Sequence, residues 1–279
     1  MTFEIQEESR YLGLPVNIYL FRFGSAPNAF YAYTDADEII TYQTIQYKPL
    51  PILRPEVRTS GTLDKTTLEI TVAANSEIAN LFIAYPPSSI INVLIRQGHL
   101  QDPNNEFLIA WSGRVLSCSR SGNEATLTCE PIATSLKRPG LRRNYQYGCP
   151  HPLYGEPCNA NKAAATITRP IAGVTGSIIG LASGWNTQPV AKYVNGLIQW
   201  TDALGNTQLR TILGTPTATS ILLSGDASIL SVGQNIQISL GCNRTMSDCL
   251  NLHNNIANFG GHPFIPKKNP IKANNNEYY

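Results

Sequence analysis

The chain has 279 residues, more than one compact domain usually holds, so two or three units are expected. Hydrophobic residues make up 42% of it, enough for packed cores, and this excludes a disordered protein. Charged residues make up only 14%, compared with roughly 25% in an ordinary soluble domain, which suits a surface that packs against other subunits. The net charge of +2 excludes the strongly basic footprint of a dedicated nucleic-acid-binding protein.

Targeting signals are not expected in this sequence. Residues 1–10 are polar and acidic, unlike a secretory signal. The sequence contains no apolar run of about 18 residues, so no membrane segment is expected. We therefore expect the protein to be made in a cytoplasm, where metal ligation or burial explains its six cysteines better than disulfides do.

Residues 1–136 have the pattern of a β region. Apolar and polar residues alternate over residues 16–23 and 67–73, and residues 107–111 form another short apolar run. Period-two alternation between turn signals is typical of half-buried strands. Residues 90–96 fit a strand or a helix, and periodicity does not decide between them.

A β-hairpin is predicted over residues 115–129, with its tip at residues 122–123 (Gly-Asn). With a two-residue turn, Leu116, Cys118 and Cys129 share one face, and the two cysteines are diagonal neighbours. Diagonal pairs lie about 7–8 Å apart, too far for an unstrained disulfide. We therefore predict that Cys118 and Cys129 are buried thiols that pack as small hydrophobic side chains.

The second half of the chain alternates between loops and short strands. Proline and glycine residues interrupt residues 137–162, which predicts an irregular loop. Residues 163–241 return to short β runs separated by turns, which indicates a small barrel or sandwich. A helix is predicted near residues 247–258, and residues 272–279 are expected to be mobile. The β runs are residues 164–167, 196–200, 208–213, 220–223 and 235–240.

The remaining four cysteines form two pairs, Cys149-x8-Cys158 and Cys242-x6-Cys249. The pairs bracket residues 163–241, so a β module with adjacent ends, as an inserted domain has, would bring all four together. Four thiolates from two irregular loops suit one soft metal centre, either tetrahedral zinc or an iron–sulfur cluster. Neither spacing is the tight Cys-x2-Cys of zinc ribbons or bacterial ferredoxins, so scattered buried thiols and disulfides remain as alternatives.

Basic residues flank these cysteine loops. A 4Fe-4S core with four thiolates carries an overall charge of about −2, and basic neighbours would offset this charge and lower the pKa values of the thiols. A solvated basic surface explains the same residues equally well. They are Lys137, Arg138, Arg142, Arg143, Lys162 and Arg244.

Both cysteine loops resemble segments of the phage tail hub proteins found in siphophages and gene transfer agents. Residues 147–158 read YGCPHPLYGEPC, residues 241–249 read GCNRTMSDC, and residues 258–266 read NFGGHPFIP. The cysteine spacing is also similar to that of the tail-tip protein L of phage lambda, although the gap between the two pairs is shorter there. The resemblance is specific in these loops and only general over residues 1–136.

This resemblance implies a mainly β fold in three parts. The expected parts are an N-terminal hub-type β-barrel region at residues 1–136, a small inserted β-barrel at residues 163–241, and a loop-rich cluster domain. The four-cysteine cluster domain would combine residues 137–162 with residues 242–279. It would bind a 4Fe-4S cluster, with zinc as the fallback metal. The implied ligands are Cys149, Cys158, Cys242 and Cys249.

The resemblance also implies a structural function in a bacteriophage tail tip. The protein would be a homotrimeric hub in the virion, assembled in the cytoplasm of the host bacterium. Its partners would be the distal tail protein at the end of the tail tube and the tip or central fibre protein. It would connect these two assemblies.

Enzyme readings find less support in the sequence. No phosphate-binding loop, dinucleotide-binding, zinc-peptidase or serine-hydrolase motif occurs, so we predict that the protein is not an enzyme. A Cys/His peptidase of the cell wall would use Cys149 or Cys158 with His253 or His262, yet a thiol nucleophile needs one activated cysteine rather than two pairs. Residues 142–147 interleave arginine with tyrosine, a pattern that would allow transient contact with DNA in the tail channel.

Overall fold

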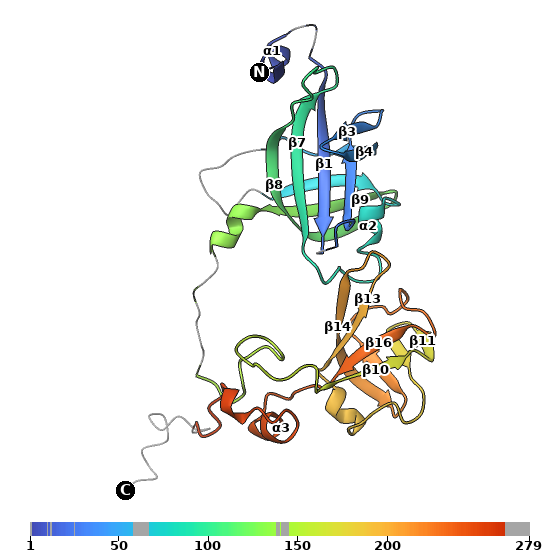
Figure 1. Cartoon of the computed structure of the whole chain (residues 1–279), viewed down its shortest axis with the longest axis vertical. Helices are drawn as coiled ribbons and strands as arrows, with labels where there is room; N and C mark the ends of the chain where they lie inside the picture. Colours follow the sequence, from blue (N-terminus) through green and yellow to red (C-terminus); the bar gives the residue numbers. More distant parts are fainter. Residues whose placement is uncertain are drawn as a thin grey trace. The chain divides into compact units, whose positions relative to one another are not determined.

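The computed structural model describes residues 2–265, with gaps at residues 10, 12, 25, 58–66, 138–139 and 141–144. The chain forms two units, Met1–Arg138 with Thr201–Gln208, and Pro139–Trp200 with Leu209–Tyr279. Each unit carries one β-sheet and the helices are short, so the expected mainly β fold is confirmed (Figure 1). None of the described helices is long and apolar enough to cross a membrane.

The sheet of the first unit contains nine strands. They are β1 (Pro15–Phe23), β2 (Phe30–Thr34), β3 (Ile40–Tyr42), β4 (Ile45–Pro49), β5 (Ile52–Leu53), β6 (Leu68–Ala73), β7 (Ile91–His99), β8 (Leu108–Ser121) and β9 (Glu124–Pro131). Their order is β3-β4-β2-β1-β7-β8-β9-β6-β5, and β2 pairs with β4 in parallel while the other pairs described are antiparallel. Helices α1 (Thr2–Glu7) and α2 (Glu77–Asn80) and the 3-10 helix η1 (Ile132–Lys137) complete the unit.

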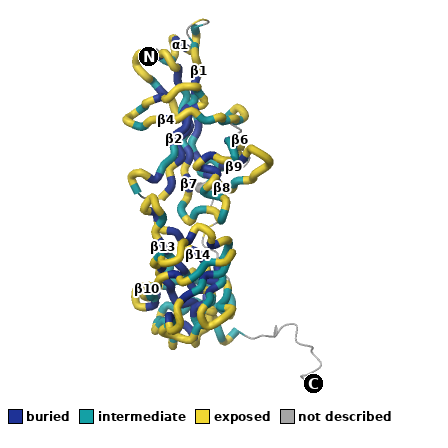
Figure 2. The backbone as a smooth tube through the Cα atoms, turned by 90° about the vertical axis from the view of Figure 1, so that its right-hand side faces the viewer, coloured by how far each residue is buried: buried dark blue, intermediate teal, exposed yellow. Residues whose placement is uncertain are grey.

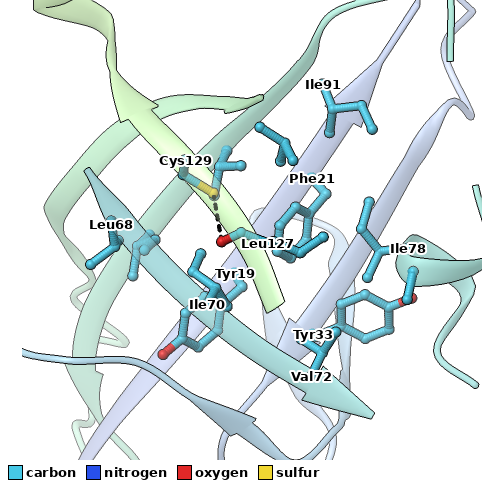
Figure 3. Packing of buried hydrophobic residues seen from close by; sticks show 14 of the residues in the cluster. Tyr19, Phe21, Tyr33, Leu68, Ile70, Val72, Ile78, Ile91, Leu127 and Cys129 are labelled. Atoms are coloured by element: carbon cyan, nitrogen blue, oxygen red, sulfur yellow. Dashed lines mark hydrogen bonds between the residues drawn. The ribbon is translucent and has the colours of Figure 1, made fainter. Parts of the chain in front are cut away.

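Strand β1 is central to this unit because side chains on both of its faces are buried. Tyr19 and Phe21 belong to the main core, together with residues of β6, β7 and β9. Ile18 and Leu20 belong to a second, smaller core on the other face. Strands β6 and β9 cross behind β1 and β7, so the sheet curls around the main core (Figures 1 and 3). Burying one such side chain contributes about 1.5–3 kcal/mol.

The β8–β9 hairpin turns at the predicted tip, with Ser121 paired to Glu124. A β-bulge between Val115 and Ser117 then adds one residue to β8. Because side chains alternate along a strand, the extra residue reverses the direction of Leu116, which is 48% exposed. The prediction that Leu116 shares the inner face with the cysteines is therefore wrong.

The two cysteines of this hairpin are free thiols. Cys129 is fully buried in the main core, and burial raises the pKa of its thiol to about 12 (Figure 3). Cys118 is partly buried and packs against the same core. Burial therefore accounts for both side chains, and the prediction of thiols that pack as hydrophobic groups is confirmed for Cys129 and, with partial exposure, for Cys118.

The sheet of the second unit contains seven strands in the order β10-β16-β13-β14-β15-β12-β11. Five match the predicted β runs, whereas β11 and β12 were not predicted because three residues are too few to show an alternation. The unit also contains the helix α3 (Met246–Asn251) and the 3-10 helices η2 (Val190–Tyr193) and η3 (Ile256–Asn258). The strands are β10 (Thr166–Pro170), β11 (Gly173–Thr175), β12 (Ile178–Gly180), β13 (Leu197–Thr201), β14 (Thr207–Thr217), β15 (Ser220–Leu223) and β16 (Asn235–Ser239).

The two ends of this seven-stranded module are adjacent. Strands β10 and β16 pair antiparallel, so Thr166 at the start of the module lies opposite Ser239 at its end. Their hydroxyl oxygens are 2.7 Å apart. The module has its own core, which includes Trp185 and Tyr193, while the loops before β10 and after β16 are largely exposed or half-buried (Figure 2). The sheet therefore delivers both cysteine loops to the same edge.

Core packing in the first unit can be tested at Ile70 on β6, which is fully buried. We expect Ile70→Ala to lower the free energy of unfolding by about 2–5 kcal/mol, because it leaves a cavity that the core does not refill. Urea denaturation followed by circular dichroism measures this loss. The control Ile109→Ala, at a side chain that is 64% exposed, should change stability by less than about 0.5 kcal/mol. Equal losses in the two variants would contradict the buried position of Ile70.

Candidate metal centre

The first cysteine loop precedes β10 and is shaped by tight turns. The backbone N–H of Gly155 donates to the carbonyl of Pro152 (3.1 Å), and that of Cys158 donates to the carbonyl of Gly155 (3.0 Å). Tyr154, within the first of these turns, has a φ of +59°, in the left-handed region. The loop therefore holds an uncommon backbone conformation that packing has to maintain.

The second cysteine loop follows β16 and leads into α3. Thr245 is the N-cap of this helix, and its hydroxyl accepts a hydrogen bond from the backbone N–H of Asp248 (3.2 Å). The backbone N–H of Arg244 donates to the sulfur of Cys242 (3.3 Å). Cys249 lies on α3 itself and is buried.

Hydrogen bonds join the two loops to each other. The backbone N–H of Cys149 donates to the carbonyl of Arg244 (2.9 Å). The phenol of Tyr154 donates to the carbonyl of Leu240 (2.6 Å), where β16 ends. These bonds connect segments that are about 90 residues apart and need no metal to form.

All four cysteines line one cavity of about 550 Å³ in the second unit. All four are free thiols, so the structure does not support the disulfide alternative. The cavity is also lined by polar groups, among them His151, Asn243 and Asn255. Among the described residues, no group of three or more His, Cys, Asp or Glu side chains is close enough to hold a single metal ion. The structure thus brings the four predicted ligands to one cavity, with space between them.

Burial and the neighbouring cysteines both disfavour ionisation of Cys242 and Cys249. Burial raises the pKa of Cys249, and the other three cysteines raise it further. Burial also raises the pKa of Cys242. The hydrogen bond from the N–H of Arg244 lowers this pKa, whereas the charges of Asp248, Cys158 and Cys149 raise it further. Each of these thiols therefore resists ionisation beside its neighbours, a resistance that a bound cation would remove.

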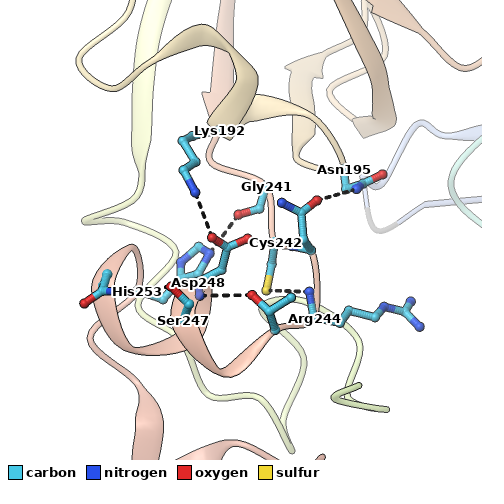
Figure 4. Close-up of polar contacts among 11 residues, drawn as sticks. Lys192, Asn195, Gly241, Cys242, Arg244, Ser247, Asp248 and His253 are labelled. Atoms are coloured by element: carbon cyan, nitrogen blue, oxygen red, sulfur yellow. Dashed lines mark hydrogen bonds and ion pairs between the residues drawn. The ribbon is translucent and has the colours of Figure 1, made fainter. Parts of the chain in front are cut away.

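The predicted role of basic neighbours finds little support. The pKa values of Cys242 and Cys249 are raised rather than lowered. The ammonium of Lys162 donates to Gln199 (2.6 Å), and the side chain of Arg244 points away from the sulfur of Cys242 (Figure 4). The side chain of Lys137 and the residues Arg138, Arg142 and Arg143 lie outside the described residues.

Sequence reasoning missed an ion pair that ties the second loop to the module. The ammonium of Lys192, in η2, lies 2.8 Å from the carboxylate of Asp248 (Figure 4). The other carboxylate oxygen accepts the backbone N–H of Asn243 (3.1 Å). Burial favours the neutral acid, but these hydrogen bonds outweigh it and lower the pKa of Asp248. The pattern Thr-x-x-Asp at residues 245–248 is a helix-capping signature that could have revealed this residue.

The contribution of Asp248 to stability can be tested by Asp248→Ala. The change leaves the ammonium of Lys192 and the N–H of Asn243 without their acceptor, and we expect a loss of about 1–3 kcal/mol at neutral pH. Because the folded protein lowers the pKa of Asp248, its contribution is present above about pH 4 and disappears as the pH falls through the folded value. Urea denaturation at decreasing pH should therefore show a shrinking difference from wild type.

The matched control for this test is Glu156→Ala, at an exposed carboxylate of the first cysteine loop. It should leave stability within about 0.5 kcal/mol of wild type at each pH. A loss in Asp248→Ala that stayed constant down to about pH 3 would mean that the charge of Asp248 is not responsible.

Comparisons with known proteins agree with this architecture. Residues 18–161 match the family described as baseplate hub protein, N-terminal attachment domain. Residues 191–269 match a second family, described as phage conserved hypothetical protein BR0599. No curated protein matches the sequence.

The solved structures include a close match in fold. A chain from the virion of a native gene transfer agent particle superposes with a TM-score of 0.76 at 17% sequence identity. The match covers 97% of this chain and 94% of that chain. At this identity the likeness shows a shared fold along nearly the whole length. Because the hub family matches more than half of the sequence, the chain belongs to the baseplate hub protein family and is a structural component of a phage-type virion.

Proposed function

We propose that this hub protein connects the end of the tail tube to the tip or fibre assembly, and that a 4Fe-4S cluster holds its second unit together. The ligands would be the thiolates of Cys149, Cys158, Cys242 and Cys249. The observation that carries the proposal is that four free thiols, from loops separated by a complete β module, line one cavity. Soft sulfur donors of this kind select iron–sulfur clusters or zinc.

The loops around the cavity have little hydrophobic core of their own. Within residues 145–162 and 241–265, the buried residues are Cys149, Ala160, Gly241, Asp248 and Cys249. Ligation would replace the missing core, as structural zinc does with about 10 kcal/mol or more in small metal domains. The cavity of about 550 Å³ leaves room for a polynuclear cluster between the cysteines. A single zinc ion holds its sulfur ligands at about 2.3 Å, and among the described residues no group of three or more His, Cys, Asp or Glu side chains could hold one ion, which favours the cluster.

The first unit is suited to contacts with other subunits. It exposes Ile39, Ile83, Ile90 and Ile109, each more than half accessible in the isolated chain. Exposed apolar groups are typical of surfaces that an assembly covers. We propose that this unit forms a homotrimer and binds the distal tail protein, while the second unit faces the tip or central fibre protein. Contact of residues 142–147 with channel DNA stays a prediction. Residues 142–144 lie outside the described residues, and the ring of Tyr145 stacks on His262 (4.1 Å).

A peptidase is the alternative that the same cysteines suggested. Among the described residues, none of the hydrogen bonds made by cysteine sulfurs goes to a histidine ring. The ring of His253 bonds instead to the carbonyl of Gly241 (2.8 Å), and that of His151 bonds to the carbonyl of Asn258 (3.1 Å). A nucleophilic thiol needs a base within hydrogen-bonding reach. These contacts favour a structural role for the cysteines.

Metal analysis tests the cluster directly. Protein purified without oxygen should be brown and contain about four irons per chain. Cys149→Ser and Cys242→Ser should lose both iron and colour, whereas Cys118→Ser, at a cysteine outside the cavity, should keep them. A colourless protein that contains about one zinc per chain would replace the cluster with a zinc-stapled domain.

Assembly separates the structural role from the enzymatic one. We expect Cys149→Ser to abolish incorporation of the protein into tails, because the loops that ligation holds would come apart. Electron microscopy of particles measures this incorporation. The homotrimer is tested separately, since sedimentation of the wild-type protein should give three times the chain mass of 30.5 kDa. Peptidoglycan hydrolysis by the wild type that Cys149→Ser lacks would support the peptidase instead.

A further inference from the structure

Asn255 occupies a junction between the two cysteine loops. It lies between α3 and η3, is half-buried, and lines the cavity with the four cysteines. No motif in the sequence distinguishes it from the other asparagines of the segment. Its contacts do, because they reach one cysteine of each pair.

The side-chain amide of Asn255 faces the first loop. Its Nδ2 donates to the carbonyl oxygen of Cys158 at 2.6 Å and lies 3.9 Å from the sulfur of the same residue. The amide orientation is fixed from the other side, since Oδ1 accepts a hydrogen bond from Nδ2 of Asn258 (2.7 Å). With Oδ1 engaged in this way, it is the nitrogen of the amide that faces both the carbonyl and the sulfur of Cys158.

The peptide groups of Asn255 face the second loop. Its backbone N–H donates to the carbonyl of Cys249 (2.9 Å), and its own carbonyl accepts the thiol of Cys249 (3.1 Å). One residue therefore fixes the backbones of Cys158 and Cys249, which are 91 positions apart in the sequence.

We propose that Asn255 is the positioning residue of the four-cysteine centre, connecting the backbones of Cys158 and Cys249 and donating an N–H to the sulfur of Cys158. This inference rests on the proposed function. The two contacts act at different stages. A sulfur that binds metal has no hydrogen to donate, so the bond from Cys249 to the Asn255 carbonyl belongs to the metal-free protein. The N–H directed at Cys158 gains strength when that sulfur carries negative charge.

A hydrogen bond to a ligand sulfur has a measurable consequence. Such bonds stabilise the form of the centre with more negative charge, which is the reduced form, and so raise its reduction potential. A side chain that merely packs would not shift the potential. The potential is therefore the readout that distinguishes a positioning role from a structural one.

The test compares two substitutions with a matched control. Asn255→Leu removes the donor, and Asn255→Asp keeps the shape but replaces the donor with an acceptor. The control is Asn251→Leu on α3. Asn251 is exposed, and the one bond described for its side-chain amide goes to the hydroxyl of Ser247 (3.2 Å). Each protein is purified without oxygen, and iron content, reduction potential and the rate of colour loss in air are measured.

We expect both Asn255 variants to lose colour faster than wild type, because loss of a partner of a metal ligand typically lowers metal affinity by about 10- to 100-fold. Their potentials should be more negative, that of Asn255→Asp most of all, whereas Asn251→Leu should match wild type. In metal-free protein, the backbone amides of the first cysteine loop should exchange their hydrogens faster in both variants, because neither can donate to the carbonyl of Cys158. This last measurement holds even where a variant binds too little iron for a potential.

The outcomes separate the two proposals. A wild-type protein without iron or visible colour overturns the proposed function. A wild-type protein with its full iron content, accompanied by Asn255 variants that match the control in potential, colour loss and hydrogen exchange of the first cysteine loop, overturns the role of Asn255 and leaves the cluster in place. Should Asn255→Leu not fold, the isosteric Asn255→Asp carries the test alone.

Discussion

We propose that the second unit depends on a cluster that holds two irregular loops together at their sulfur atoms. The loops are separated by a module whose first and last strands, β10 and β16, pair with each other, so both loops start from the same edge. Hydrogen bonds then bring Cys149 next to Arg244. Very little apolar surface is buried between the loops, and hydrogen bonds between exposed segments contribute little net stability because water competes for both partners. A bond among the four sulfurs is the contribution that this part of the molecule lacks.

The first unit is stabilised by a hydrophobic core of its own. Its sheet curls around a core in which Phe21, Ile70 and Leu127 are fully buried. Cys129 packs into that core as an apolar side chain, and burial holds its thiol in the neutral form. The cysteines of the second unit line a cavity with polar groups instead. One residue type thus has two roles, and the environment that the fold provides decides between them.

A static joint suits a protein of the baseplate hub family. In the proposed function the protein connects neighbouring subunits of the virion, and a fixed link between the loops would serve that purpose better than a mobile one. The ion pair between Lys192 and Asp248 and the bonds of Asn255 act in the same direction, since each connects a cysteine loop to a neighbouring segment. Under the proposed function, these contacts would orient the four cysteines before any metal binds.

Local patterns predicted much of this architecture, and the failures have local causes. The alternation in residues 16–23 predicted β1, and the turn residues at 122–123 predicted the hairpin tip. The bulge at Leu116 was not predicted, because nothing in the sequence marks the one residue that it adds to β8. The bulge nevertheless turns the side chain of Leu116 to the opposite face of the strand. Strands β11 and β12 escaped because three residues carry no period.

The sequence by itself determined the β character of the chain, the two cysteine pairs and the loops that carry them, because these follow from residue type and short-range spacing. The tertiary structure alone decided that all four thiols line one cavity, and that Asp248, Lys192 and Asn255 join the loops to their surroundings. Those contacts connect residues from 6 to 97 positions apart. Long-range contacts arise from sheet pairing and packing, which no local pattern encodes.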